Sequence, residues 1–560
     1  MKHATVIYTG GIIYTVAGPD WEHYPVSSMA IDDGGKFLAV GSMNECKVFA
    51  DDNTKVVDLK GKTVLPGMVD GHVHAPGDSF KVLYQIDLNG CLTYEAVTDA
   101  VRRFVKSHPD NDSYFGQGFR METVDAEGNP ICAKWLDDIC PDKPVSIISY
   151  DMHSFWLNTK AMETCGITED TEEIGSGHMH RYEDGSITGI FTDMQNINFL
   201  DPVYTEEETN AALLRFIKKM NQWGYTSMMS IPPYTFMECT HYRKIEEAGQ
   251  LTMKVNCGQE INPATIEEDI DALVELKKFF EGSKVNISTA KFFIDGVVEG
   301  KTAFLREPYA EGAGMPADYR GASHWTLEQL EKACMMAMSR GFQTHMHTIG
   351  DAAVELGLDA IESVQTELGN KGYRNALTHL QLIDPADRLR FAKEKVIAAI
   401  QPYWFLKDPK MYGTLEVPYL GETRALQMYP AKSLVDLGVV ITASADYPIT
   451  VVNDPFAGIQ AAVTRTIYNE DFGVDIPDSD NDPYLLGPEE RLTVPRMIEA
   501  FTINGAYELF REEETGSLEA GKCADFIVID QDILNIDTAD IYKTNVIATV
   551  ADGKVVYGEI

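Results

Sequence analysis

The chain has 560 residues, too many for one ordinary core, and its 44% hydrophobic and 24% charged residues are typical of a globular protein with two or three structural units. A formal net charge of −39 argues against nucleic acid and anionic membrane surfaces as partners, because both attract a positive face. The nine cysteines are scattered without a Cys-x-x-Cys pair, which argues against a disulfide framework and a thiolate zinc site. No apolar run approaches the roughly 20 residues of a membrane span, which argues against a membrane protein.

The two ends of the chain alternate apolar and polar residues as β-strands do. Residues 28–41 predict a hairpin around Asp33-Gly34-Gly35, and residues 545–560 predict one that turns at Asp552-Gly553. We expect the ends to pair into one small β-sandwich domain, composed of residues 1–64 and 511–560. The start lacks the apolar h-region and the cleavage site of a signal peptide, which favours a cytoplasmic location.

Between the ends, eight apolar, strand-like runs alternate with helix-like segments such as 326–341 and 385–395. The runs are residues 63–74, 226–231, 251–257, 288–296, 342–348, 375–382, 396–402 and 439–446. This βαβ rhythm predicts an α/β fold with a parallel sheet, and eight strands favour a closed (β/α)8 TIM-type barrel over residues 65–510. A helix-like segment at 493–510 would close it.

Residues 76–200 interrupt this rhythm. They are rich in Asp, Gly and Pro and contain hairpin-like pieces such as residues 180–191. We interpret them as an insertion after the first barrel strand, at the catalytic face of the barrel.

Polar residues stand at the carboxyl ends of the predicted barrel strands, where barrels of this class keep their chemistry. They are His72, His74, Lys291, His345, His347, His379 and Asp446. Imidazole nitrogens and carboxylate oxygens are ligands suited to zinc or a similar divalent ion. Because residues two apart on a strand face the same side, a His-x-His pair directs both rings into the barrel. The spacing alone is weak evidence, since a single His-x-His strand pattern is more often structural.

The combination resembles the amidohydrolase superfamily, in which "PGxxDxHxH" ends the first barrel strand and later strands supply Lys, His, His and Asp. Further marks resemble the branch that includes N-substituted formamide deformylase. They include "GQGFR", "HSFWLN", "KFFIDGVVEGKTA", "HTIGDAAV", "THLQLI", "SADYPI" and "GSLEAGKCADFIVID", and together they cover nearly the whole chain. Departures fall around the pocket, with Met152, Thr348, Ala445 and Asp193 at positions where the family usually has other residues.

The resemblance implies roles for the strand-end residues. His72 and His74 would bind the first metal, and Asp446 would both contact the metal and act as the base. His347 and His379 would belong to a second metal position. Zinc is the expected ion, one or two per chain.

Lys291 matches the lysine that carries carbon dioxide as a metal-bridging carbamate, an N6-carboxylysine, in binuclear relatives. The alternative is an ordinary ammonium that pairs with Asp295 or with a substrate carboxylate. His345 faces the same way as His347 but one pleat deeper, which favours a supporting or core role.

Several residues remain candidates outside the ligand set. The resemblance implies a substrate contact for His153, with plain packing as the alternative. Gln117 and Asp295 are candidates for substrate contact or for support of the ligands, and Trp156 is a candidate for the pocket wall or the core. The third His-x-His pattern, His178 and His180, lies in the insertion, where we expect exposed loop histidines.

The implied function is metal-assisted hydrolysis of a small-molecule amide, N-formyl or cyclic amide C–N bond by activated hydroxide. An ester or phosphoester hydrolase, a deaminase or an isomerase could use the same site. A binding protein that has lost its metal is disfavoured, because every ligand position is filled. The family also implies a homodimer.

Overall fold

A computed structural model describes residues 2–149, 154–173, 178–192, 194, 197, 199–231, 239–476 and 482–560. The chain divides into two compact units, residues 1–77 with 214–560, and residues 78–213. The boundaries of a separate terminal domain at residues 64 and 511 stay a prediction.

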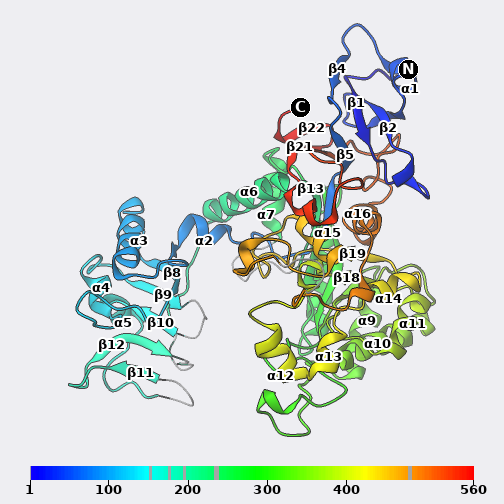
Figure 1. Ribbon diagram of the computed structural model, residues 1–560. Helices are drawn as coiled ribbons and strands as arrows, with labels where there is room; N and C mark the ends of the chain where they lie inside the picture. Colours follow the sequence, from blue (N-terminus) through cyan, green and yellow to red (C-terminus); the bar gives the residue numbers. More distant parts are fainter. Residues whose placement is uncertain are drawn as a thin grey trace. The chain divides into compact units, whose positions relative to one another are not determined.

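Strands from both ends of the chain form one eight-stranded sheet. Its order is β22-β21-β20-β5-β1-β2-β3, with β4 paired to β1, and the blue and red strands lie together in Figure 1. The strands are β1 (Val6–Ile13), β2 (Val26–Ile31), β3 (Phe37–Gly41), β4 (Lys55–Asp58), β5 (Thr63–Pro66), β20 (Phe526–Ile529), β21 (Val546–Ala551) and β22 (Lys554–Gly558). The β2–β3 and β21–β22 hairpins confirm the two predicted turns.

The terminal sheet folds over onto itself. In a flat sheet β3 and β20 would be four strand spacings apart, about 19 Å. The ring centroids of Phe37 on β3 and Phe526 on β20 are instead 6.4 Å apart, and the Tyr8 ring on β1 lies 5.3 Å from that of Phe526. The two halves of the sheet therefore share one apolar core, which is the arrangement of a sandwich.

Eight parallel strands form the barrel, in the order β19-β18-β17-β16-β15-β14-β13-β6. They are β6 (Met68–Val73), β13 (Tyr225–Ser230), β14 (Lys254–Glu260), β15 (Val285–Phe293), β16 (Gln343–Thr348), β17 (Ala376–His379), β18 (Ile397–Ile400) and β19 (Ile441–Ala443). The end strands β6 and β19 contact each other, so the ring is nearly closed. Each strand coincides with one of the eight predicted runs, which confirms the barrel. Its strands are almost wholly buried because helices and side chains cover both faces.

The predicted first run divides between two sheets. Its first part is β5 of the terminal sheet and its second part is β6 of the barrel, with Gly67 between them. A Cβ atom at Gly67 would lie 2.3 Å from the Thr226 hydroxyl oxygen. Glycine is therefore required where the chain passes from the terminal sheet into the barrel.

Helices follow the barrel strands. They are α6 (Glu206–Gln222), α7 (Thr240–Glu247), α8 (Ile266–Phe279), α9 (Leu327–Ser339), α10 (Asp351–Leu368), α11 (Pro385–Glu394), α12 (Val417–Leu420), α13 (Glu422–Leu426), α14 (Ala431–Asp436), α15 (Pro455–Thr464), α16 (Val494–Ala500) and α17 (Ile503–Glu508). The short α1 (Met43–Cys46) belongs to the terminal sheet. The segment predicted as one helix at 493–510 is two helices, because Thr502 leaves the helical conformation.

The second unit has its own six-stranded sheet, in the order β11-β12-β10-β9-β8-β7. The strands are β7 (Ile86–Asp87), β8 (Tyr114–Phe119), β9 (Val145–Ser149), β10 (Ser154–Leu157), β11 (His178–Arg181) and β12 (Ile187–Thr192). The helices are α2 (Ser79–Tyr84), α3 (Tyr94–Ser107), α4 (Ala133–Asp137) and α5 (Thr159–Thr164). A core of apolar side chains, including Trp135 and Trp156, makes this insertion a folded unit.

No helix among the described residues combines the length and the apolar character needed to cross a bilayer.

Candidate metal centre

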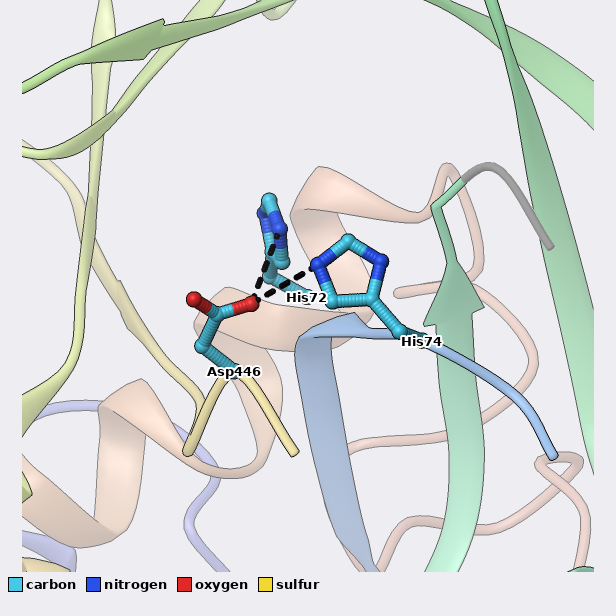
Figure 2. A group of neighbouring side chains, drawn as sticks. All are labelled: His72, His74 and Asp446. Atoms are coloured by element: carbon cyan, nitrogen blue, oxygen red, sulfur yellow. Dashed lines mark ion pairs between the residues drawn. The ribbon is translucent and has the colours of Figure 1, made fainter. Parts of the chain in front are cut away.

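Two strands at opposite ends of the barrel sheet bring three ligand groups together (Figure 2). His72 is on β6, His74 directly follows it, and Asp446 lies three residues after β19. Asp446 Oδ1 is 3.0 Å from His74 Nε2 and 3.4 Å from His72 Nε2. One ligand atom from each residue fits within 4.8 Å of the others. These residue types and this spacing suit a divalent metal ion.

The backbone fixes Asp446 against the end of β6. Asp446 has φ +56°, a left-handed conformation that aspartate tolerates better than most residues. The amide N–H of His74 donates to the carbonyl of the next residue, Tyr447, over 2.9 Å. The two ligand-bearing segments are therefore tied together directly.

Two imidazoles each have one ring nitrogen at a backbone carbonyl oxygen. His74 Nδ1 lies 3.1 Å from the Ile231 carbonyl oxygen, and His347 Nε2 lies 3.1 Å from that of Gly296. A carbonyl only accepts, so these nitrogens carry the proton. The opposite nitrogens, Nε2 of His74 and Nδ1 of His347, are left with a lone pair that can bind a metal.

His379 is oriented by an amide side chain. Its Nδ1 lies 3.0 Å from Gln401 Oε1, and Gln401 Nε2 donates to Ser444 Oγ over 2.8 Å. The Trp404 ring is stacked against the His379 ring, with the ring centroids 5.6 Å apart.

His72 is supported from below by a buried chain of side chains. Its Nδ1 lies 2.8 Å from His345 Nε2, and His345 Nδ1 lies 3.4 Å from Glu508 Oε1. When His72 Nδ1–H donates to His345, its Nε2 is available toward Asp446. His345 is fully buried and contacts His72, and its supporting role stays a prediction.

Four of the site histidines have lowered pKa values, which favours their neutral forms. Burial, with a smaller effect from the charge of Lys291, lowers the pKa of His347 to about 3. Burial also lowers the pKa of His72, His345 and His379 well below the usual range. Neutral imidazoles are the form that binds metals.

Lys291 projects from β15 into the same site. Its side chain is fully buried, and its Nζ has no hydrogen-bond partner among the residues that the structure describes. Burial lowers its pKa to about 7, against the opposing attraction of Asp446 and Glu260. A large share of this amine is thus unprotonated near neutral pH.

The alternative pairing of Lys291 with Asp295 is wrong for this structure. The Asp295 carboxylate accepts backbone N–H groups from Phe304, Ile349 and Gly350 instead. Asp295 Oδ1 lies 3.9 Å from His347 Nε2. The loop segments that the Asp295 carboxylate binds are therefore placed beside that imidazole.

The remaining predicted residues lie in the second unit. Trp156 is fully buried in its core and donates Nε1–H to the Cys132 carbonyl, which favours the core alternative. Gln117 lies on β8 and is partly exposed. His153 lies outside the described residues, as do Met152 and Asp193.

The third His-x-His pattern lies in the second unit. His178 and His180 lie on strand β11 rather than in a loop, which corrects the prediction of loop histidines. His178 is exposed and 3.3 Å from Glu173, and His180 Nε2 is 3.1 Å from Thr192 Oγ1. The described residues near them contribute no further ligand group to a metal cluster.

A cavity of about 670 Å³ opens over the ligand groups. Its volume lies in the range of small-molecule sites. Besides the ligand residues, aromatic and aliphatic side chains form most of its wall, including Phe293, Tyr403, Trp404, Leu406, Met411 and Phe472.

Residue patterns missed several members of the site. Asp70 stands inside the "PGMVDGHVH" motif, accepts the His72 amide over 3.0 Å and is bound by Asn453 Nδ2 over 2.6 Å. Gln401 stands at the end of the predicted run 396–402 and directly follows β18, as strand-end candidates do, and could have been found by that signal. Glu508 is on a helix outside the strand ends and carries no such signal.

Comparisons with known proteins agree with this geometry. The model of the amidohydrolase family matches residues 55–557 of the chain. The chain belongs to the amidohydrolase family. It is accordingly a metal-dependent hydrolase of carbon–nitrogen bonds other than peptide bonds.

The amidohydrolase is similar over its full length to proteins from several organisms. It is 27% identical to YtcJ of Bacillus subtilis, over 98% of this chain and 99% of that protein. It is 23% identical to N-substituted formamide deformylase of Arthrobacter pascens, over 94% of each. An uncharacterised metal-dependent hydrolase from Pyrococcus furiosus has the same fold, with a TM-score of 0.73 and 24% identity over 95% of this chain and 100% of that one.

Proposed function

We propose that this amidohydrolase hydrolyses the C–N bond of small N-acyl or N-formyl amines at a zinc centre held by His72, His74 and Asp446. The observation that carries the proposal is the convergence of these three ligand groups at the floor of a small-molecule cavity. The similarity to an N-substituted formamide deformylase supports the choice of bond.

A divalent ion in this site would lower the pKa of a water molecule to about 7 and polarise the scissile carbonyl. Asp446 would take the proton from the water, since its Oδ1 is buried beside the histidine ligands and has no hydrogen-bond donor among the described residues. A new C–O bond forms, the C–N bond breaks, and Asp446 returns the proton to the leaving nitrogen. The neutral histidines would retain their lone pairs throughout.

A second metal position would use His347, His379 and a carbamate on Lys291. The neutral Nζ would attack carbon dioxide, form an N–C bond and release a proton, which converts an amine into an anionic oxygen donor. Two observations support this step: Nζ is buried without a partner among the described residues, and its pKa is about 7.

Metal analysis and substrate assays test the proposal together. Protein expressed with zinc and bicarbonate is analysed for metal per chain, alongside Lys291→Ala and Lys278→Ala, which removes an exposed lysine on α8. About two metals in the wild type and in Lys278→Ala, but fewer in Lys291→Ala, are expected for a carbamate-bridged centre. About one metal in all three would contradict the carbamate and leave a mononuclear site.

Substrate class is tested with N-formyl amines against matched formate esters, with ammonia release recorded separately. We expect the amides to be turned over faster than the esters. We also expect no release of ammonia from an amidine substrate. Turnover of the esters alone, or release of ammonia from an amidine substrate alone, would contradict the proposed reaction.

A further inference from the structure

The cavity over the metal centre also contains acidic side chains that the proposed chemistry does not use. Glu299, on the loop after β15, and Glu416 both line the cavity, as do Asp408 and Asp471. Among the described residues that line the cavity, Lys291 is the only lysine, and none is an arginine. The cavity thus has an excess of anionic acceptors.

Glu416 is the most enclosed of these acids. It ends a short π-helical segment, Tyr412–Glu416, and its side chain is only 6% exposed. Gln381 Nε2 donates to its Oε1 over 3.2 Å, but its Oε2 is buried and has no hydrogen-bond partner among the described residues. Because burying an acceptor without a donor costs free energy, Oε2 is suited to bind a donor group that enters the cavity.

Gln381 connects this acid to the metal centre. It follows the ligand residue His379 by two positions, and its carbonyl accepts the amide N–H of Tyr429 over 2.9 Å. Glu416 is therefore held at a fixed place relative to the end of β17. π-Helical segments are frequent at functional sites, where they direct a side chain that a regular helix would turn away.

Glu299 and Glu416 interact with each other. Burial, followed by repulsion from Glu299, raises the pKa of Glu416 to about 8, and burial also raises that of Glu299. Two carboxylates that share an apolar wall can both ionise when a cation lies between them. A bound cationic nitrogen would supply both the charge and the N–H donors.

We propose that Glu416 and Glu299 determine specificity by binding a cationic nitrogen group of the substrate, an ammonium, amidinium or guanidinium, at the end remote from the scissile amide. This inference rests on the proposed function, because it names the amine that carries the acyl or formyl group. The aromatic wall, with Trp404 and Tyr403, would surround the aliphatic part and contribute cation–π attraction.

Two matched amides test the inference. In N-formyl-1,5-diaminopentane the chain ends in an ammonium group, and in N-formylhexylamine a methyl group replaces it. The wild-type holoenzyme is expected to show a kcat/KM about 10 to 100 times higher for the cationic amide, carried mainly by KM, as for a hydrogen-bonded charge. In Glu416→Gln this ratio is expected to approach one, because the glutamine keeps the acceptor for Gln381 but loses the charge.

Glu422→Gln is the matched control, because Glu422 is exposed on α13 and does not line the cavity. It should retain the wild-type ratio. Glu299→Gln provides a second variant if Glu416→Gln fails to fold, and it should also lower the ratio. Equal rates for the two amides in the wild type, or an unchanged ratio in the folded variants, would overturn the inference.

A binding measurement separates this inference from the proposed function. Calorimetry with pentylammonium against 1-pentanol needs no turnover. Binding of the ammonium to wild type, weakened in Glu416→Gln, without hydrolysis of either amide would support the cation site and contradict the proposed reaction. Hydrolysis of both amides at equal rates, without binding of pentylammonium, would support the proposed reaction and contradict the cation site.

Discussion

Each imidazole that we propose as a metal ligand depends on the group that contacts its other ring nitrogen. The group at Nδ1 is a backbone carbonyl for His74, an amide oxygen for His379 and a second imidazole for His72. Such partners fix the tautomer and the ring direction, so a change in a partner alters metal affinity without touching a ligand. At the residue scale, the site consists of ligands and of the groups that orient them.

Loss of a ligand should remove the metal, whereas loss of a surface histidine should not. His72→Ala is expected to abolish metal retention, because one of the three converging donors is lost. His178→Ala is the control, since His178 is exposed on β11. Elemental analysis after gel filtration measures both, and equal metal loss in the two variants would contradict the separation of the His-x-His patterns.

Gln401 should act through the orientation of His379. Gln401→Leu leaves His379 Nδ1 without an acceptor, and we expect metal affinity or kcat/KM to fall by about 10- to 100-fold. Gln401→Glu restores an oxygen acceptor at the same position and should recover a large part of the loss. Failure of the glutamate to rescue, with both variants folded by circular dichroism, would argue for a packing role alone.

At the scale of elements, ion pairs join the terminal sheet to the barrel. Lys254, the first residue of β14, donates over 2.7 Å to both Asp525 and Asp552, and Asp552 also binds Lys284 over 2.5 Å. These lysines hold the pKa of Asp552 well below its usual range, although burial opposes them. The turn between β21 and β22 is thereby attached to the amino-terminal end of the barrel.

Asp552→Asn should therefore destabilise the protein at neutral pH. A carboxyl group with a lowered folded-state pKa contributes stability above its unfolded pKa of about 4, and this contribution is lost as the pH falls toward the folded value. We expect a loss of about 1–3 kcal/mol at pH 7. The unfolding temperatures of the variant and the wild type are measured at pH 7 and at pH 3. The difference between them should be smaller at pH 3.

Asp436→Asn provides the comparison for this prediction, because Asp436 pairs with Lys432 at the exposed surface of α14. Its effect should be small at both pH values, as for most surface pairs. A pH-independent effect of Asp552→Asn would show that the carboxyl charge does not hold the turn.

At the scale of the whole molecule, we expect metal binding to be linked to folding. The three candidate ligands come from the end of β6 and from the segment after β19, which close the barrel, so an ion between them would hold the two ends of the sheet together. A ligand that binds only the folded state stabilises it by about 2.7 kcal/mol at 100 times its Kd.

Removal of the metal with a chelator should lower the unfolding temperature of the wild type by a few degrees. Scanning calorimetry with and without added zinc measures the shift. His72→Ala should already unfold at the lower temperature and should not respond to the chelator. A chelator effect of equal size in this variant would place the stabilising metal elsewhere.

Strand positions and ligand positions were predictable because their signals are local. All eight barrel strands coincide with apolar runs, and His72, His74 and Asp446 stand where those runs end. A parallel barrel collects the carboxyl ends of its strands at one face, so the convergence of strand-end residues follows from the topology. The folded insertion with its own sheet was less visible, since short strands and Asp- and Gly-rich turns dilute the periodic pattern.

The sequence by itself determined the barrel, the closure of the chain ends into one sheet and the three converging ligands, because each depends on periodicity or on position at a strand end. The tertiary structure alone decided the supporting groups. Glu508 approaches His345 from a helix outside the strand ends, and Glu416 lines the cavity from an irregular helix that no period predicts. Orientation and burial of such groups arise from contacts between distant segments, and no local pattern encodes them.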